Sequence, residues 1–261
     1  MRLLLRRPGD GHLDDGGAAG AGRAGRRRGG HHPATCRPPV LYLLHGLSDD
    51  HTAWLRQTRA TRYAEQAGLA LVMPSAGRSF YADEAQGHRY WTFVAEELPE
   101  VVRAFFGLSQ QPATTYVAGL SMGGYGAQAR AATPGAVRRG GQPVGGAEPG
   151  LPPGRRRDDI RDRVFGGALS AQDDLFALLD RADLPPLWVG CGTEDQLVAG
   201  NHAFVARARE RGHQVTADFR PGEHSWDLWD PMLAAVLDWL PGRTAPPDGP
   251  DARADRRIGP A

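Results

Sequence analysis

The sequence predicts an α/β fold in which helices cover both faces of a mostly parallel central sheet. Short apolar runs alternate with amphipathic segments from Pro39 to Pro241, which is the order expected when strands and helices alternate along the chain. Most of these runs are continuously apolar, as is typical of parallel strands buried on both faces. At 261 residues, the chain has the length of one large domain of this class.

Four segments have the composition of buried strands, and a fifth alternates like an outer strand. The buried strands are expected at 40–46, 69–74, 114–120 and 184–195, and the outer strand at 214–222. Helices are expected at 53–68, 91–107, 123–133, 202–212 and 225–241. A proline inside the second helix is expected to kink it. Residues 1–38 and 134–158 show neither period, and the Pro-, Asp- and Arg-rich tail at 242–261 is expected to be disordered.

The composition argues against several classes of protein. The 31 basic residues, all of them Arg, nearly balance 30 acidic residues, so neither a nucleic-acid surface nor a polybasic membrane surface is expected. Cys36 and Cys191 have no metal-binding spacing around them, which favours reduced thiols in a cytoplasmic protein and no metal. No run approaches the length of a membrane span, and the apolar part of "MRLLLRRPGD" is too short for a signal peptide.

The strongest motif is "GLSMG" at 119–123, a G-x-S-x-G pattern placed after an expected strand and before an expected helix. A serine on such a sharp turn needs small neighbours, because the strand and helix backbones approach each other closely there. The helix N-terminus also directs free N–H groups toward a developing oxyanion. The pattern therefore predicts that Ser121 is a nucleophile.

A nucleophilic serine requires a base and a carboxylate that orients the base. "CGTED" follows the fourth buried strand and "PGEHSWD" follows the outer strand, so the chain order is serine, acid, histidine. Asp195 is preferred as the acid over Glu194, and His224 is the expected base. His202 and His213 lie in or at the end of an expected surface helix and are expected to have no catalytic role.

Two backbone amides are the expected oxyanion donors. Leu47 belongs to "HGLSDD", the loop after the first buried strand, and Met122 follows the nucleophile. Four aromatic side chains are candidates for substrate contacts, with ordinary packing as the alternative for each: Trp54, Tyr81, Trp91 and Trp226.

The quoted motifs, together with "VMPSAGRSFYADEAQGHRYWTFVAEELP" and "VFGG", resemble the tributyrin-esterase branch of the esterase D superfamily. That superfamily also contains S-formylglutathione hydrolases and mycolyltransferase-type proteins. The resemblance covers about 40–133 and 160–241, and it implies an α/β-hydrolase catalytic domain over 39–241. It also implies hydrolysis of short-chain acyl esters without any cofactor, and the same triad and oxyanion residues. The expected partner is a small-molecule ester; self-association is left open.

Two alternatives remain within this class of enzyme: an S-formylglutathione hydrolase, or an acetyl or feruloyl carbohydrate esterase. Formylglutathione hydrolases usually have a cysteine after the first central strand, where this chain has "HGLSDDHTAW", which favours a general esterase.

A third alternative is an inactive or poorly folded product of a frameshifted esterase gene. The superfamily's N-terminal hairpin, and its buried strand of the type "FAAAASLSG" after the nucleophile helix, are missing from the expected places. A chain with Arg and no Lys indicates GC-rich DNA. Residues 136–145, "AVRRGGQPVG", can be encoded by a GC-rich DNA sequence that gives RFAAAASLSG when it is read one base later. Residues 4–20, shifted by one base in the same way, can give a segment that resembles the superfamily's N-terminal hairpin. These two segments are therefore interpreted as out-of-frame remnants of the hairpin and of a central strand.

Overall fold

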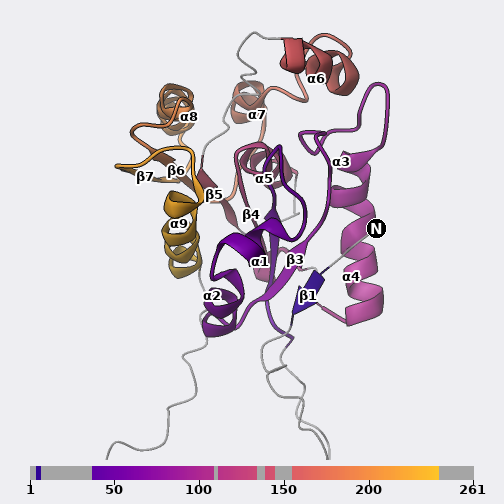
Figure 1. Cartoon of the computed structure of the whole chain (residues 1–261), viewed down its shortest axis with the longest axis vertical. Coiled ribbons are helices and arrows are strands. Elements are labelled where there is room, and N and C mark those ends of the chain that lie inside the picture. The colour runs from indigo at the N-terminus through magenta and orange to yellow at the C-terminus, as the bar shows by residue number, and fades with distance from the viewer. Residues whose placement is uncertain (1–3, 7–36, 109–110, 134–138, 145–154, 241–261) are drawn as a thin grey trace, which may run out of the picture.

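The computed structural model describes residues 4–6, 37–108, 111–133, 139–144 and 155–240. These residues form a seven-stranded sheet in the order β1-β3-β2-β4-β5-β6-β7 (Figure 1). β1 is antiparallel to β3, and every other neighbouring pair is parallel. The strands are β1 (Leu4–Arg6), β2 (Val40–Leu44), β3 (Ala70–Met73), β4 (Thr115–Leu120), β5 (Arg139–Val144), β6 (Leu187–Gly192) and β7 (Val215–Arg220). The predicted α/β class, with a mostly parallel sheet, is confirmed.

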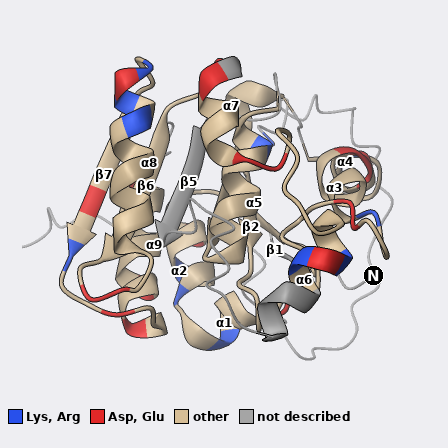
Figure 2. Ribbon diagram, turned by 90° about the horizontal axis from the view of Figure 1, so that it is seen from above, with Lys and Arg blue, Asp and Glu red and all other residues tan. Residues whose placement is uncertain are grey.

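Helices pack on both faces of this sheet (Figure 2). Consecutive residues of β2 face opposite sides, so Tyr42 and Leu44 belong to one hydrophobic core and Leu41 and Leu43 to the other. The first core includes residues of α4 to α8, and the second includes residues of α1, α2 and α9. The helices are α1 (Ala53–Gln57), α2 (Ala60–Gln66), α3 (Tyr90–Thr92), α4 (Leu98–Phe106), α5 (Met122–Ala131), α6 (Arg155–Phe165), α7 (Leu175–Arg181), α8 (Val198–Glu210) and α9 (Trp226–Trp239), with a 3-10 turn at Pro112–Thr114.

The helix expected at 91–107 contains a π-helical turn, Phe93–Glu97, between α3 and α4. Pro99 has no backbone N–H and so cannot donate to the carbonyl of Ala95, four residues earlier. That carbonyl instead accepts a hydrogen bond of 2.6 Å from Nη1 of Arg130, a buried residue of α5. The expected proline irregularity is therefore a π-turn whose released carbonyl binds the nucleophile helix.

The segment 134–158 differs from the sequence prediction, because β5 pairs with both β4 and β6 there. No strand is predicted from "RGGQPV", since it is neither apolar nor alternating, but a parallel ladder is formed by backbone groups. The register between β4 and β5 shifts between Ala118 and Leu120. Pro143 lies at this irregularity, where a residue without an N–H is tolerated in a sheet.

Other predicted boundaries differ in smaller ways or remain untested. Residues 4–6 pair with β3 although 1–38 was expected to be irregular, and α6 and α7 were not anticipated. The predicted tail 242–261 and most of 1–38 lie outside the described residues.

The direction of the chain places the site at the carboxyl edge of the sheet. In the sheet, β3 lies beside one edge of β2 and β4 lies beside the other, so the chain changes direction across the sheet between β3 and β4. Such a switch point separates the loops that follow the two strands and leaves a crevice there. The loop after β2 carries Leu47 and the turn after β4 carries Ser121.

Candidate active site

Ser121 forms the turn between β4 and α5 and has φ 51° and ψ −118°. A positive φ is unfavourable for a residue with a side chain, and such strain is concentrated at functional sites. The flanking glycines make the turn sterically feasible. A Cβ on Gly119 would lie 2.3 Å from the carbonyl oxygen of Gly123, and one on Gly123 would lie 2.4 Å from that of Leu44. The G-x-S-x-G spacing thus has a steric cause in this fold.

Asp195 and His224 come together from the loops after β6 and β7. Oδ2 of Asp195 lies 2.6 Å from Nδ1 of His224, and Oδ1 accepts a hydrogen bond of 2.8 Å from the amide of Leu197. Asp195 is 2% exposed, so both of its oxygens are held by partners away from solvent. A Cβ on Gly192 would lie only 2.0 Å from the carbonyl oxygen of Gly222. The two loops can approach this closely because a glycine stands at that contact.

Glu194, the alternative acid, is oriented elsewhere. Its carboxylate accepts hydrogen bonds from the amide of Gly222 and from the hydroxyl of Thr193, the latter at 2.9 Å. The hydrogen bond from Gly222, followed by that from Thr193, lowers the pKa of Glu194. Glu194 therefore links the two loops, and Asp195 is the carboxylate that contacts the histidine.

In the described part of the chain, Ser121 is not hydrogen-bonded to the Asp195–His224 pair. Among the hydrogen bonds of the described residues, none joins Ser121 Oγ to His224, although both residues lie at the carboxyl edge of the sheet. Catalytic hydrogen bonds of ligand-free enzymes are often long and shorten when substrate binds.

Two backbone amides near Ser121 are available to a ligand. Met122 is the first residue of α5, where a helix leaves its N–H groups without intrahelical acceptors. Leu47 follows Gly46 in a turn closed by the hydrogen bond from the amide of Asp49 to the carbonyl of Gly46. No described residue accepts a hydrogen bond from the amide of Leu47 or Met122.

The four aromatic candidates occupy different environments. Trp54 is fully buried, and its Nε1 donates to the carbonyl of Leu44, so it packs beneath the site. Tyr81 is 1% exposed and is likewise enclosed. Trp226 is half-buried and packs edge-on against both Trp54 and Trp229, while Trp229 packs edge-on against His224. Of these side chains, Trp226 has an accessible surface beside the histidine.

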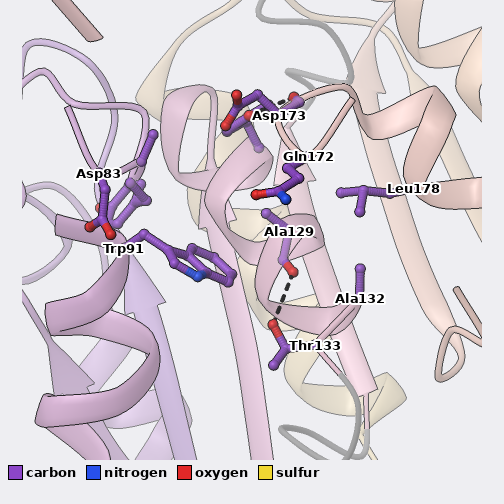
Figure 3. Close-up of a pocket in the computed structure, with 11 residues that line it drawn as sticks. Asp83, Trp91, Ala129, Ala132, Thr133, Gln172, Asp173 and Leu178 are labelled. Atoms are coloured by element: carbon purple, nitrogen blue, oxygen red, sulfur yellow. Dashed lines mark hydrogen bonds between the residues drawn. The ribbon is translucent and has the colours of Figure 1, made fainter. Parts of the chain in front are cut away.

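Trp91 lines a cavity of about 540 Å³ beside α5. Figure 3 shows Trp91 facing the helix across this space, with Thr133 at the far end and Gln172 and Asp173 opposite. A second cavity, of about 530 Å³, is lined by residues that include His51, Ser75 and Phe93. Neither cavity is lined by Ser121, Asp195 or His224.

The described residues contain no group of three or more His, Cys, Asp or Glu side chains suited to holding a metal ion. No helix among them is long and apolar enough to cross a membrane.

Comparison with known proteins agrees with this geometry. The sequence profile of the Putative esterase family matches residues 30–135. An acetyl esterase of Caldicellulosiruptor saccharolyticus is 28% identical over 219 residues, which cover 77% of this chain and 82% of that protein. The substrate-bound structure of fluorophosphonate-binding serine hydrolase F from Staphylococcus aureus has a TM-score of 0.73 at 28% identity, over 80% of this chain and 86% of that one. S-formylglutathione hydrolase (FrmB) of the same organism has a TM-score of 0.69 at 29% identity, over 79% and 85%.

The resemblance to the esterase D superfamily is confirmed by these comparisons. This esterase has an α/β-hydrolase fold and is a carboxylic ester hydrolase, as the sequence predicted.

Sequence reasoning missed two residues of the esterase that surround the site. From the sequence, His45 is assigned only to the end of the strand expected at 40–46, yet it is fully buried and hydrogen-bonded on both ring nitrogens. The sequence suggests a substrate contact or ordinary packing for Tyr81, whereas its hydroxyl donates to the carbonyl of His45. The signal available in the sequence was the polar His45 at the end of an apolar strand, but its partners are 31 and 36 residues away.

Proposed function

We propose that the esterase hydrolyses short-chain acyl esters through an acyl-enzyme formed on Ser121. The observation that carries the proposal is the buried Asp195 carboxylate 2.6 Å from Nδ1 of His224, at the same sheet edge as the strained Ser121. Because Nδ1 faces a carboxylate, it carries the ring proton, and Nε2 is left free to act as a base. The amides of Leu47 and Met122 are the proposed oxyanion donors.

In the first half-reaction, Ser121 Oγ attacks the acyl carbonyl carbon while Nε2 of His224 takes the hydroxyl proton. Asp195 stabilises the imidazolium that forms, and the two amides stabilise the negative oxygen of the tetrahedral intermediate. The C–O bond to the alcohol then breaks, and the alcohol leaves with the proton from His224. Water then attacks the acyl carbon while His224 takes its proton; the bond to Ser121 Oγ breaks, Oγ regains the proton, and the carboxylic acid leaves.

The preference for short acyl groups is supported by the relative from Caldicellulosiruptor saccharolyticus, which is an acetyl esterase. The FrmB likeness supports S-formylglutathione as the competing substrate. A feruloyl or acetyl sugar ester is the other alternative. A matched panel of p-nitrophenyl acetate, butyrate and octanoate, S-formylglutathione and feruloyl and acetyl sugar esters would separate these.

The decisive variant is Ser121→Ala, which removes only the attacking oxygen. We expect it to lower kcat on p-nitrophenyl acetate by at least about 10⁴-fold. Circular dichroism melting of both proteins is the control, because a cooperative transition separates an inactive enzyme from the unfolded product of a frameshifted gene. A folded wild type that cleaves no ester, or a Ser121→Ala variant as active as wild type, would refute the proposal.

A cytoplasmic location also belongs to the proposal, and cell fractionation tests it.

A further inference from the structure

Tyr81 lies in a strained segment that follows β3. Phe80 and Tyr81 have φ values of 53° and 57°, the left-handed region that bulky residues rarely occupy. Two consecutive aromatic residues in this conformation persist only where their surroundings hold them there. The amide of Tyr81 donates to Oγ of Ser79 at 3.0 Å, and the side chains of all three residues are buried. This strained conformation fixes the direction of the Tyr81 ring.

The hydroxyl of Tyr81 donates a hydrogen bond of 3.1 Å to the backbone carbonyl of His45. Burial, the largest influence, raises the pKa of Tyr81 well above its ordinary value, so the hydroxyl stays protonated and remains a donor. Without this donor, a carbonyl in a fully buried residue would lose a partner. The hydrogen bond therefore fixes the backbone two residues before Leu47.

The imidazole of His45 adds two further connections to this turn. Its Nε2 accepts a hydrogen bond of 3.0 Å from the amide of Ala76, so the proton is on Nδ1, which lies 2.8 Å from the carbonyl oxygen of Gly46. Burial lowers the pKa of His45, which keeps the ring neutral and suited to accepting one hydrogen bond while donating the other. The turn that carries the amide of Leu47 is thus held by the loop after β3.

The ring of Tyr81 also packs against the nucleophile helix. A Cβ on Gly126 would lie 2.6 Å from Cδ2 of Tyr81, so the ring rests directly on the helix backbone. Gly126 is four residues after Met122, and residues with this spacing lie on the same helix face. One side chain therefore contacts both the turn that carries the amide of Leu47 and the helix that carries the amide of Met122.

We propose that Tyr81 is a positioning residue that fixes the separation of the two oxyanion donors, Leu47 and Met122. This inference rests on the proposed function. Donors stabilise a developing oxyanion only when they are already aimed at its position, and a small displacement weakens both bonds in the transition state. Tyr81 itself contacts neither substrate nor the reacting atoms.

The test compares Tyr81→Phe with Tyr125→Phe. Tyr125 is a matched control, because it is also buried and donates through its hydroxyl to a backbone carbonyl, that of Asp173, at 2.6 Å. Each variant keeps its ring and loses one buried hydrogen bond, so similar decreases in melting temperature are expected. Tyr81→Phe is expected to lower kcat about tenfold with KM within about twofold, while Tyr125→Phe keeps kcat within about twofold.

A second measurement isolates binding of the oxyanion. A trifluoromethyl ketone adds to the serine as a tetrahedral oxyanion, so its affinity for Tyr81→Phe should fall by the same factor as kcat/KM. Unchanged kcat and inhibitor affinity in Tyr81→Phe, or equal losses in both variants, would overturn the inference. Ser121→Ala is assayed in parallel: if it is as active as wild type, the proposed function fails as well, whereas an inactive Ser121→Ala with a normal Tyr81→Phe removes only the role of Tyr81.

Discussion

Replacing Gly123 by alanine tests the steric explanation of the serine turn. The new Cβ would lie 2.4 Å from the carbonyl oxygen of Leu44 and 2.7 Å from that of His45. Both are backbone atoms at the end of β2, so α5 and β2 would have to separate by roughly 1 Å to restore ordinary contact. We expect Gly123→Ala to lower the free energy of unfolding by about 1–3 kcal/mol. Misplacing Ser121 and Leu47 by that distance is expected to lower kcat about 100-fold.

Gly200→Ala is the matched control for this experiment. Gly200 lies within α8, and no atom lies within 4 Å of the position that its Cβ would take. The substitution should raise the free energy of unfolding by about 0.5–1 kcal/mol, because alanine restricts the unfolded chain and favours a helix. Urea denaturation and hydrolysis of p-nitrophenyl acetate measure both quantities on both variants. A Gly123→Ala protein with the stability and kcat of wild type would refute the reasoning.

The remaining predictions concern two carboxylates. Asp195→Asn is expected to lower kcat on the order of 10⁴-fold, because it favours the wrong tautomer of His224. The kcat of Glu194→Gln is expected to stay within about twofold of wild type. Equal losses of kcat in steady-state kinetics would contradict the choice of Asp195 as the acid. Asp230 is partly buried, which raises its pKa, but hydrogen bonds from Arg59 and then Tyr63 outweigh burial and the pKa is lowered overall. Because the folded pKa lies below the usual 3.8, this stabilisation is present at higher pH and is lost as the pH falls through the folded pKa. Asp230→Asn should therefore be less stable than wild type by about 1 kcal/mol at pH 7, and a difference that persists at pH 2 in denaturation curves contradicts this account.

Local patterns were sufficient to predict the fold class, and they nominated the candidate triad. The apolar runs that became β2, β3, β4 and β6 are buried along their whole length. Asp195 could be preferred over Glu194 from its spacing after Gly192, and it is the carboxylate that contacts His224. The prediction of the fold class succeeded because a buried strand needs particular residue types at short, regular spacings, and a serine turn has the same kind of local requirement.

β5 could not be predicted, because its ladder depends on neighbouring strands and its sequence lacks apolar periodicity. Trp54 and Tyr81 were candidates for substrate contacts, but only the packing of distant segments shows that both are enclosed.

The sequence by itself determined strands β2, β3, β4, β6 and β7, the serine turn and the residues able to form a triad, since each depends on neighbours along the chain. The tertiary structure alone decided that Tyr81 joins His45 to the helix of Ser121, and that Gly192 meets Gly222. Those contacts join segments that are 30 or more residues apart, and their geometry depends on how the loops pack once the sheet has formed.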